Sequence, residues 1–235
     1  MYYYSLNNYL KSTFGEKVYK ISLNGGMTCP NRDGKIDTRG CIFCSRGGSG
    51  EFSADSCLSV SQQIEQAKQR IRSKSDCKKF IAYFQPFTNT YADVDYLRKL
   101  YYEAAMPDEI VALSIATRPD CISDEVISLL DEINRFKPVW IELGLQTIHK
   151  RTAEYIRRGY ELGVYDEAVL KRISSGVNRI THMIIGLPYE TKQDILQSVK
   201  YAGERSNGIK LQLLHVLKDT DLLTDYNNGV FETLT

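Results

Sequence analysis

Six short apolar runs, separated by segments with helical periodicity, constrain the fold of this chain more than any other feature. In the segment that follows the third run, Val126, Leu130 and Ile133 recur at the spacing of one helix face. Side chains suited to capping a helix precede three of the segments, at Asp93, Ser123 and Thr191. Alternation of strands and helices predicts a parallel sheet with helical crossovers. The runs cover residues 18–23, 80–84, 110–116, 139–145, 180–186 and 209–217.

The number of strands limits the architecture. A closed barrel of alternating strands and helices has eight strands and about 250 residues, whereas this chain has 235 residues and six predicted strands. We therefore expect one domain over residues 1–235, folded as an incomplete six-stranded barrel or as an open doubly wound sheet. Residues 147–175 should hold two helices, broken near residues 159–163. In either fold the functional groups gather beyond the carboxyl ends of the strands.

Charge and composition exclude several classes of protein. The chain has 30 Lys and Arg against 29 Asp and Glu, a net charge of +1, so no strong overall attraction to nucleic acid or to an anionic membrane is expected. No apolar run approaches the roughly 20 residues of a membrane span, and the N-terminus lacks the pattern of a secretion signal. These features predict a cytoplasmic protein with no membrane partner. In that reducing compartment its six cysteines favour a metal site or catalysis over disulfides.

A long polar loop after the first strand contains three of the cysteines: Cys29, Cys41 and Cys44. The last two form a Cys-x-x-Cys pair that can grip one metal centre, and the first can fold back as a third ligand. Iron–sulfur clusters are held by thiolates, and three thiolates leave one iron of a 4Fe–4S cluster open. A structural zinc ion normally takes four protein ligands. The alternative is therefore a zinc site completed by a histidine or by Cys57.

The loop and four other blocks resemble the radical S-adenosylmethionine (SAM) enzymes. The Cys-x11-Cys-x2-Cys spacing is similar to that of the branch that contains the elongator catalytic subunit. The match is closer to an uncharacterised bacterial family of predicted Fe–S oxidoreductases, and the blocks that carry it follow one another at predicted strand ends. They are residues 29–34, 83–91, 117–121, 142–147 and 186–191. The resemblance implies an α/β fold with a partial (β/α)6 TIM-type barrel.

The resemblance also implies the cofactors. Cys29, Cys41 and Cys44 would hold a 4Fe–4S cluster whose fourth iron binds SAM through its amino nitrogen and carboxylate. Electron transfer from a donor such as flavodoxin or ferredoxin would then cleave SAM to a 5′-deoxyadenosyl radical, which abstracts hydrogen from the substrate. The substrate itself is left open. Relatives in the elongator branch modify tRNA, so that a tRNA or another macromolecule is one candidate.

Four polar side chains are candidates for contact with SAM. At the end of the second strand, where related enzymes place an acid, the resemblance implies that Gln85, Thr88 or backbone carbonyls meet the SAM amino group. Gln146 would be a neighbour of SAM or a helix cap. Arg158 resembles an arginine that pairs with the SAM carboxylate, for which a guanidinium is well suited.

A carboxylate and two main-chain positions complete the expected site. Glu142 lies inside an apolar strand, where a buried carboxylate is costly without partners. We expect it to accept hydrogen bonds from the SAM ribose or to pair with Arg118. Gly186 is expected near the adenine, and the backbone around Val216 would read the adenine edge. His215, alone in an apolar strand, is expected to be packed rather than catalytic.

Two other functions fit the same residues less well. One is a noncatalytic Fe–S or zinc-binding module that recruits a macromolecule such as RNA. The other is an open-sheet nucleotide-binding protein without a metal. We also expect the domain to lack a C-terminal extension and its barrel to be open on one side, since 18 residues follow Leu217.

Overall fold

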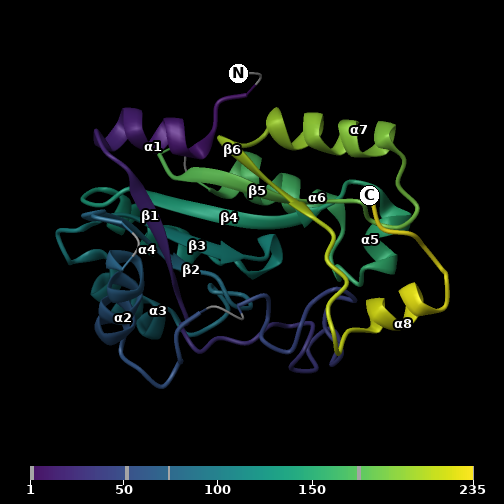
Figure 1. Ribbon diagram of the computed structural model, residues 1–235, viewed down its shortest axis with the longest axis horizontal. Coiled ribbons are helices and arrows are strands. Elements are labelled where there is room, and N and C mark those ends of the chain that lie inside the picture. The colour runs from purple at the N-terminus through teal and green to yellow at the C-terminus, as the bar shows by residue number, and fades with distance from the viewer. Residues whose placement is uncertain (1–2, 51–52, 74, 174–175, 235) are drawn as a thin grey trace.

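The fold is a curled sheet of six parallel strands, described by a computed structural model for residues 3–50, 53–73, 75–173 and 176–234. The strands are hydrogen-bonded in the order of the sequence, with β1 at one edge and β6 at the other (Figure 1). A doubly wound sheet would instead reverse its strand order part-way. The predicted partial (β/α)6 TIM-type barrel is therefore confirmed. The strands are β1 (Val18–Leu23), β2 (Lys79–Phe84), β3 (Ile110–Thr117), β4 (Val139–Gln146), β5 (Asn178–Ile185) and β6 (Gly208–Leu213).

The helices between the strands cover the outer face of the sheet, and α1 and α8 lie before the first strand and after the last. The three predicted N-caps are confirmed: Asp93, Ser123 and Thr191 each accept a hydrogen bond from the first turn of the helix that follows. The two helices predicted within residues 147–175 are also present, and Ser174 and Ser175 at the end of that segment lie outside the described residues. The helices are α1 (Leu6–Phe14), α2 (Val60–Arg72), α3 (Val94–Ala105), α4 (Asp124–Asn134), α5 (Lys150–Tyr155), α6 (Leu162–Glu167), α7 (Lys192–Gly203) and α8 (Asp221–Asn227), with short turns η1 (Pro119–Cys121) and η2 (Ala168–Arg172).

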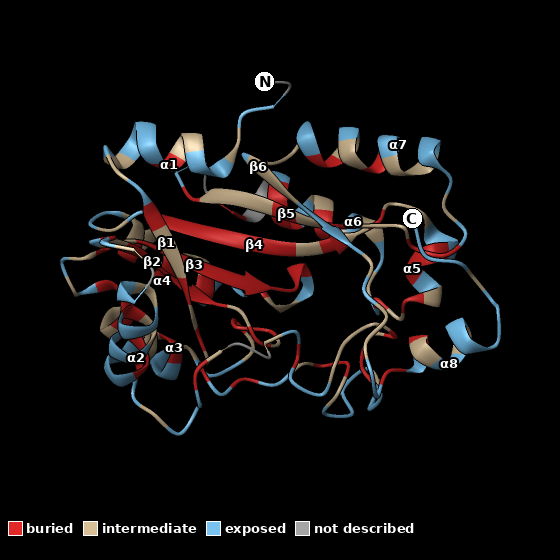
Figure 2. Cartoon of the chain, viewed as in Figure 1, coloured by how far each residue is buried: buried red, intermediate tan, exposed pale blue. Residues whose placement is uncertain are grey.

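Alternation along the strands sends one set of side chains outward and the other into the barrel. The outward set packs against the helices in the main hydrophobic core, to which Phe80, Leu113 and Ile141 belong. Figure 2 shows the middle strands as the most buried part of the molecule.

The amino-terminal end of the barrel is closed by an apolar plug. Inward side chains from the starts of the strands, among them Val18, Ile81 and Trp140, pack with Leu10 of α1 in a separate cluster. Tyr9 adds an edge contact to Trp140, with ring centroids 5.7 Å apart. This helix was not expected from the sequence. Because it closes the amino-terminal end, the interior of the barrel is accessible from the carboxyl-terminal end.

The last strand is shorter than predicted. β6 ends at Leu213, and the amide of Leu214 donates one more hydrogen bond, of 2.9 Å, to the carbonyl of Ile185 before the chain leaves the edge. The chain then runs to α8, where Leu222 packs beside Ile42 of the cysteine loop. Val216 therefore lies in a connecting segment and not in a strand. Within the described residues, no helix is long and apolar enough to cross a membrane.

The plug generates a stability prediction. Leu10→Ala should lower the free energy of unfolding by about 2–5 kcal/mol, because it leaves a cavity beneath the barrel. Leu6→Ala in the same helix is the matched control, since Leu6 is 49% exposed, and it should change stability by about 0.5 kcal/mol or less. Urea unfolding of the metal-free protein measures both. Equal effects of the two substitutions would contradict the plug.

Candidate active site

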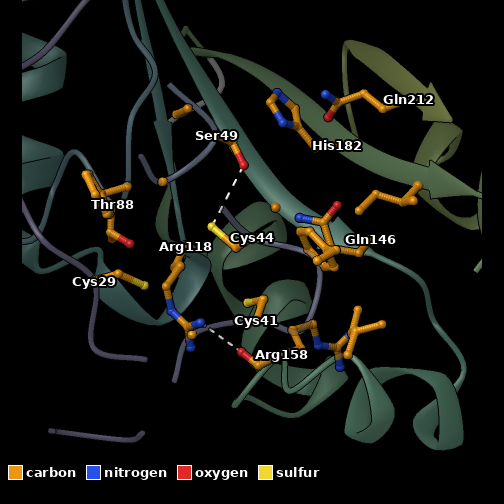
Figure 3. A pocket seen from close by; sticks show the side chains of 18 of the residues that line it. Cys29, Cys41, Cys44, Ser49, Thr88, Arg118, Gln146, Arg158, His182 and Gln212 are labelled. Carbon is orange, nitrogen blue, oxygen red and sulfur yellow. Dashed lines mark hydrogen bonds between the residues drawn. The ribbon is translucent and has the colours of Figure 1, made fainter. Parts of the chain in front are cut away.

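A cavity of about 460 Å³ lies at the carboxyl ends of the strands. Its walls come from the cysteine loop, from the ends of β2 to β6 and from the segment after β6. Cys29, Cys41 and Cys44 all line it, and Figure 3 shows them around one space, opposite Gln146 and His182. This is the edge at which a parallel barrel places its functional groups.

Hydrogen bonds within the cysteine loop hold the three thiols at this edge. The carbonyl of Cys29 accepts from the amide of Arg32 at 2.8 Å, and the carbonyl of Cys41 accepts from the amide of Cys44 at 2.9 Å. The Arg32 guanidinium donates to the carbonyl of Cys44 at 2.9 Å. Gly40 has φ +81°, and a Cβ there would lie 3.0 Å from Arg32 Nε, so this turn requires glycine.

The side chain of Cys41 is buried beside a second cysteine and a cation. Burial and the neighbouring Cys44 raise the pKa of the Cys41 thiol to about 11, whereas the charge of Arg118 acts in the opposite direction. The side-chain amide of Asn31 donates to Cys41 Sγ at 3.4 Å. Metal binding must therefore displace a proton from this thiol, and both Arg118 and Asn31 stabilise the thiolate that results.

The three thiols fit a cluster better than a single ion. Among the residues that the structure describes, no three His, Cys, Asp or Glu side chains lie close enough together to hold one metal ion. Cys57, the sulfur ligand considered for a zinc site, is exposed and does not line the cavity. A 4Fe–4S cluster is wider than an ion and takes each thiolate on a different iron. Three cysteines of one loop around one cavity fit that group.

Gln85 and Thr88 lie on the wall of the cavity beside the loop. Gln85 Nε2 donates to the carbonyl of Ser49 at 2.6 Å, and its Oε1 accepts from Ser22 Oγ at 3.4 Å. Thr88 is buried, and its amide donates to the carbonyl of Thr28 at 3.2 Å. Both residues thus connect the end of β2 to the loop that carries the cysteines.

Gln146, the last residue of β4, is strained and incompletely bonded. Its φ is +68°, a conformation that is uncommon for a residue other than glycine. Its Oε1 is buried without a hydrogen-bond partner among the described residues. Because Gln146 lines the cavity, this acceptor is available to a donor on a bound molecule.

Arg158 lines the same cavity but also organises its wall. The guanidinium donates to the carbonyls of Leu145 at 3.2 Å, Thr147 at 2.6 Å and Tyr160 at 3.1 Å. It lies over the ring of Tyr160, 4.5 Å from the centroid. Arg158 therefore stabilises the turn after β4, and its pairing with the SAM carboxylate stays a prediction.

Two of the expected residues lie apart from the cysteines. Gly186 and Val216 line a second cavity, of about 380 Å³, together with Leu234. His215 borders both cavities and is exposed. Its expected packing is wrong, because β6 ends before it and no element covers it within the described chain. Gly186 and Val216 as adenine contacts stay predictions.

Glu142 is the centre of a buried ionic network. It is fully buried, and its Oε1 accepts hydrogen bonds from Lys20 Nζ and Ser114 Oγ. Its Oε2 accepts from His182 Nε2 at 2.6 Å. The expected pair with Arg118 is wrong, because that guanidinium makes a bidentate bond to a carboxylate two residues along the chain, at 2.9 and 2.7 Å. Sequence reasoning missed these partners of Glu142.

These partners belong to a ring of polar side chains that we call the polar belt. Each strand contributes one member from an inward position between the apolar plug and the cysteine end. In the register of the sheet Tyr83 pairs with Ser114 and His182 pairs with Lys210. At the other three strand pairs the member on the following strand lies two residues beyond the paired position. The members are Lys20, Tyr83, Ser114, Glu142, His182 and Lys210. A polar residue in the middle of an apolar strand was the signal that could have identified them.

The belt fixes the charges of its members. Burial would raise the pKa of Glu142, but the hydrogen bond from His182 and the charge of Lys20 hold it well below its usual value. Burial lowers the pKa of His182, although Glu142 opposes this. At neutral pH the imidazole is therefore neutral and donates its Nε2 proton, because a carboxylate can only accept.

Comparison with known proteins identifies the family. Residues 37–202 match the family model described as the radical SAM superfamily. The chain belongs to the radical SAM superfamily. It is 42% identical to the uncharacterised protein YtqA of Bacillus subtilis (strain 168) over 99% of this chain and 73% of that protein. It is 36% identical to the protein YhcC of Escherichia coli (strain K12) over 94% of this chain and 71% of the other.

The superfamily fold is shared with a solved structure of the archaeal Elp3 of Methanocaldococcus infernus. The two superpose with a TM-score of 0.62 at 17% identity, over 92% of this chain and half the length of the other. This likeness shows the fold alone. The expected membership of a radical SAM family close to uncharacterised bacterial proteins is confirmed, and the relation to the elongator branch is a distant one.

The polar belt of this radical SAM protein generates a second stability prediction. Lys20→Met should lower the free energy of unfolding by about 3 kcal/mol, because it leaves the buried carboxylate of Glu142 without its ion-pair partner. Lys200→Met, on the exposed face of α7, is the control and should have little effect. Urea unfolding at pH 7 measures both. A Lys20→Met protein as stable as the control would show that the ion pair does not hold the belt.

Proposed function

We propose that this chain is a radical SAM enzyme that carries a 4Fe–4S cluster on Cys29, Cys41 and Cys44 and binds SAM in the adjoining cavity. The observation that carries the proposal is the meeting of three cysteines from one loop with the carboxyl ends of the strands in a single cavity. The superfamily, which consists generally of enzymes, supports it. The cluster, when bound, supplies the electron that cleaves SAM to a 5′-deoxyadenosyl radical.

The residues around the cysteines would stabilise the negative charge of a cluster held by thiolates. Arg118 brings a buried positive charge near Cys41, and Asn31 donates to its sulfur. Phe43, Phe87 and Ile156 supply apolar walls. Such walls exclude water and strengthen the charge interactions inside the cavity.

SAM would be oriented by groups that have unused hydrogen-bonding capacity. The buried Oε1 of Gln146 would accept from the ammonium group or a ribose hydroxyl of SAM, which are donors. Gln85 and Thr88 would border the amino end of the molecule. Arg158 would bring positive charge towards the SAM carboxylate while its guanidinium holds the turn after β4. An electron carrier such as flavodoxin or ferredoxin would be the reductant, and a tRNA or other macromolecular substrate remains a prediction.

The cysteines provide the first test. Cys29→Ala, Cys41→Ala and Cys44→Ala should each lose the cluster and the ability to form 5′-deoxyadenosine. Cys57→Ala is the matched control, because that thiol is exposed and free, and it should retain both. Iron and sulfide are measured per chain after anaerobic reconstitution, and 5′-deoxyadenosine after incubation with SAM and dithionite. Full iron content in Cys44→Ala would refute the ligand assignment.

The same measurements separate the proposed enzyme from a binding module. Four irons per chain with formation of 5′-deoxyadenosine support the enzyme. One tightly bound zinc ion per chain, with no 5′-deoxyadenosine, would replace it with a noncatalytic zinc module.

Gln146 provides a second test. Gln146→Ala should weaken SAM binding to the reconstituted protein by about tenfold, the effect of losing one hydrogen bond to a charged group. Gln197→Ala is the control, because Gln197 is exposed on α7, and it should bind SAM normally. Calorimetric titration with SAM measures both affinities. If the two variants bind equally well, the unpaired amide oxygen serves another molecule.

A further inference from the structure

The polar belt has more positive than negative charge. Lys20 and Lys210 are cationic, Glu142 is anionic, and His182 is neutral at pH 7. Lys20 neutralises Glu142 directly through their ion pair. The belt is therefore left with the charge of Lys210, on the edge strand β6.

Lys210 is a cation with no carboxylate partner. Among the described residues, no Asp or Glu lies within ion-pair distance of its ammonium group. The contact found there is a hydrogen bond of 3.2 Å to the hydroxyl oxygen of Tyr83, whose ring centroid is 5.2 Å away. An ammonium group has three N–H donors, so this bond uses one of them.

An anionic ligand would stabilise this arrangement. Lys210 is partly exposed at the wall of the cavity, so its ammonium group is only partly desolvated. Partial desolvation of a cation without a counter-charge still costs free energy, and burial lowers the pKa of Lys210 although Glu142 opposes the shift. Glu142 cannot offset the charge well, because its oxygens already accept from Lys20, Ser114 and His182.

The position of Lys210 separates it from the cysteines. Lys210 is in the third position of β6, at the level of the belt, whereas the cysteines lie on a loop beyond the strand ends. Both nevertheless line the same cavity. A molecule bound at the belt would therefore lie on the strand side of groups held by the cysteines.

We propose that Lys210 binds an anionic substituent, a carboxylate or a phosphate, of the substrate at the floor of the cavity. This inference rests on the proposed function, which assigns the cysteine end to the cluster and SAM. The anion would supply the counter-charge that Lys210 lacks, and charge-assisted hydrogen bonds of this kind are among the stronger ones. The substrate would reach the belt from the cysteine end, since α1 and the apolar plug close the other end.

Binding of small anions to the reconstituted protein tests the proposal. Inorganic phosphate and acetate are titrated by calorimetry into the wild type, Lys210→Met and the control Lys200→Met. The wild type and the control should bind at least one of them saturably, and Lys210→Met should bind it about tenfold or more weakly. Which of the two anions binds distinguishes a phosphate from a carboxylate. SAM affinity should be the same in all three proteins.

A second measurement guards against misfolding of the variant. Lys210→Met should unfold at a temperature equal to or above that of the wild type, because it removes an uncompensated cation. Addition of the anion should raise the unfolding temperature of the wild type and leave that of Lys210→Met unchanged.

Several results would overturn the anion site. These are equal anion affinity in all three proteins, no saturable binding by the wild type, and loss of SAM affinity in Lys210→Met with anion affinity retained. The last result would assign the lysine to SAM. A different result would refute the proposed function alone: no cluster and no 5′-deoxyadenosine form, while phosphate or acetate binding still depends on Lys210.

Discussion

The buried carboxylate of Glu142 is the interaction on which the interior of this barrel depends. The six strands do not close into a ring, since β1 and β6 are the two edges of the sheet, so hydrogen bonds between strands do not hold the edges together. Glu142 on β4 instead receives Lys20 from β1 and His182 from β5. An ionic contact across the interior thus draws the first strand towards the far side of the sheet.

The interior is arranged in three levels because inward positions recur every second residue on each strand. The apolar plug closes the amino-terminal end of the barrel. The polar belt forms the next level, and the cysteine loop borders the carboxyl-terminal end. The levels are thus apolar, polar and thiol-bearing in that order. A charged belt is tolerable in the middle because Lys20, Ser114 and His182 all bond to Glu142. Lys210 bonds to Tyr83 and lines the cavity.

The fold and the position of the cysteines could be predicted from the sequence because both are local patterns. Apolar runs with capped helices between them indicate a parallel sheet, the family resemblance selects the partial barrel, and Cys41 and Cys44 are close along the chain. The partners of Glu142 could not be predicted, because Lys20 and His182 are distant in sequence and meet only through the curvature of the sheet. Arg118 shows how a local partner competes with a distant one. Its guanidinium pairs with Asp120, two residues along the chain, because bringing the two together costs less conformational entropy than pairing with the distant Glu142. The early end of β6 could not be predicted either, and the segment after it leads to α8, whose Leu222 packs in a tertiary cluster with Ile42 of the cysteine loop.

Several unfavourable features of the structure lie at one cavity. Of the six described residues other than glycine with positive φ, Ser49, Phe87 and Gln146 line it, and such conformations are retained where the surrounding structure enforces them. Gln146 adds a buried unpaired oxygen, and Lys210 adds a cation without a counter-charge. The proposed ligands would offset this cost: a hydrogen-bond donor of SAM at Gln146 near the cysteines, and an anion at the belt.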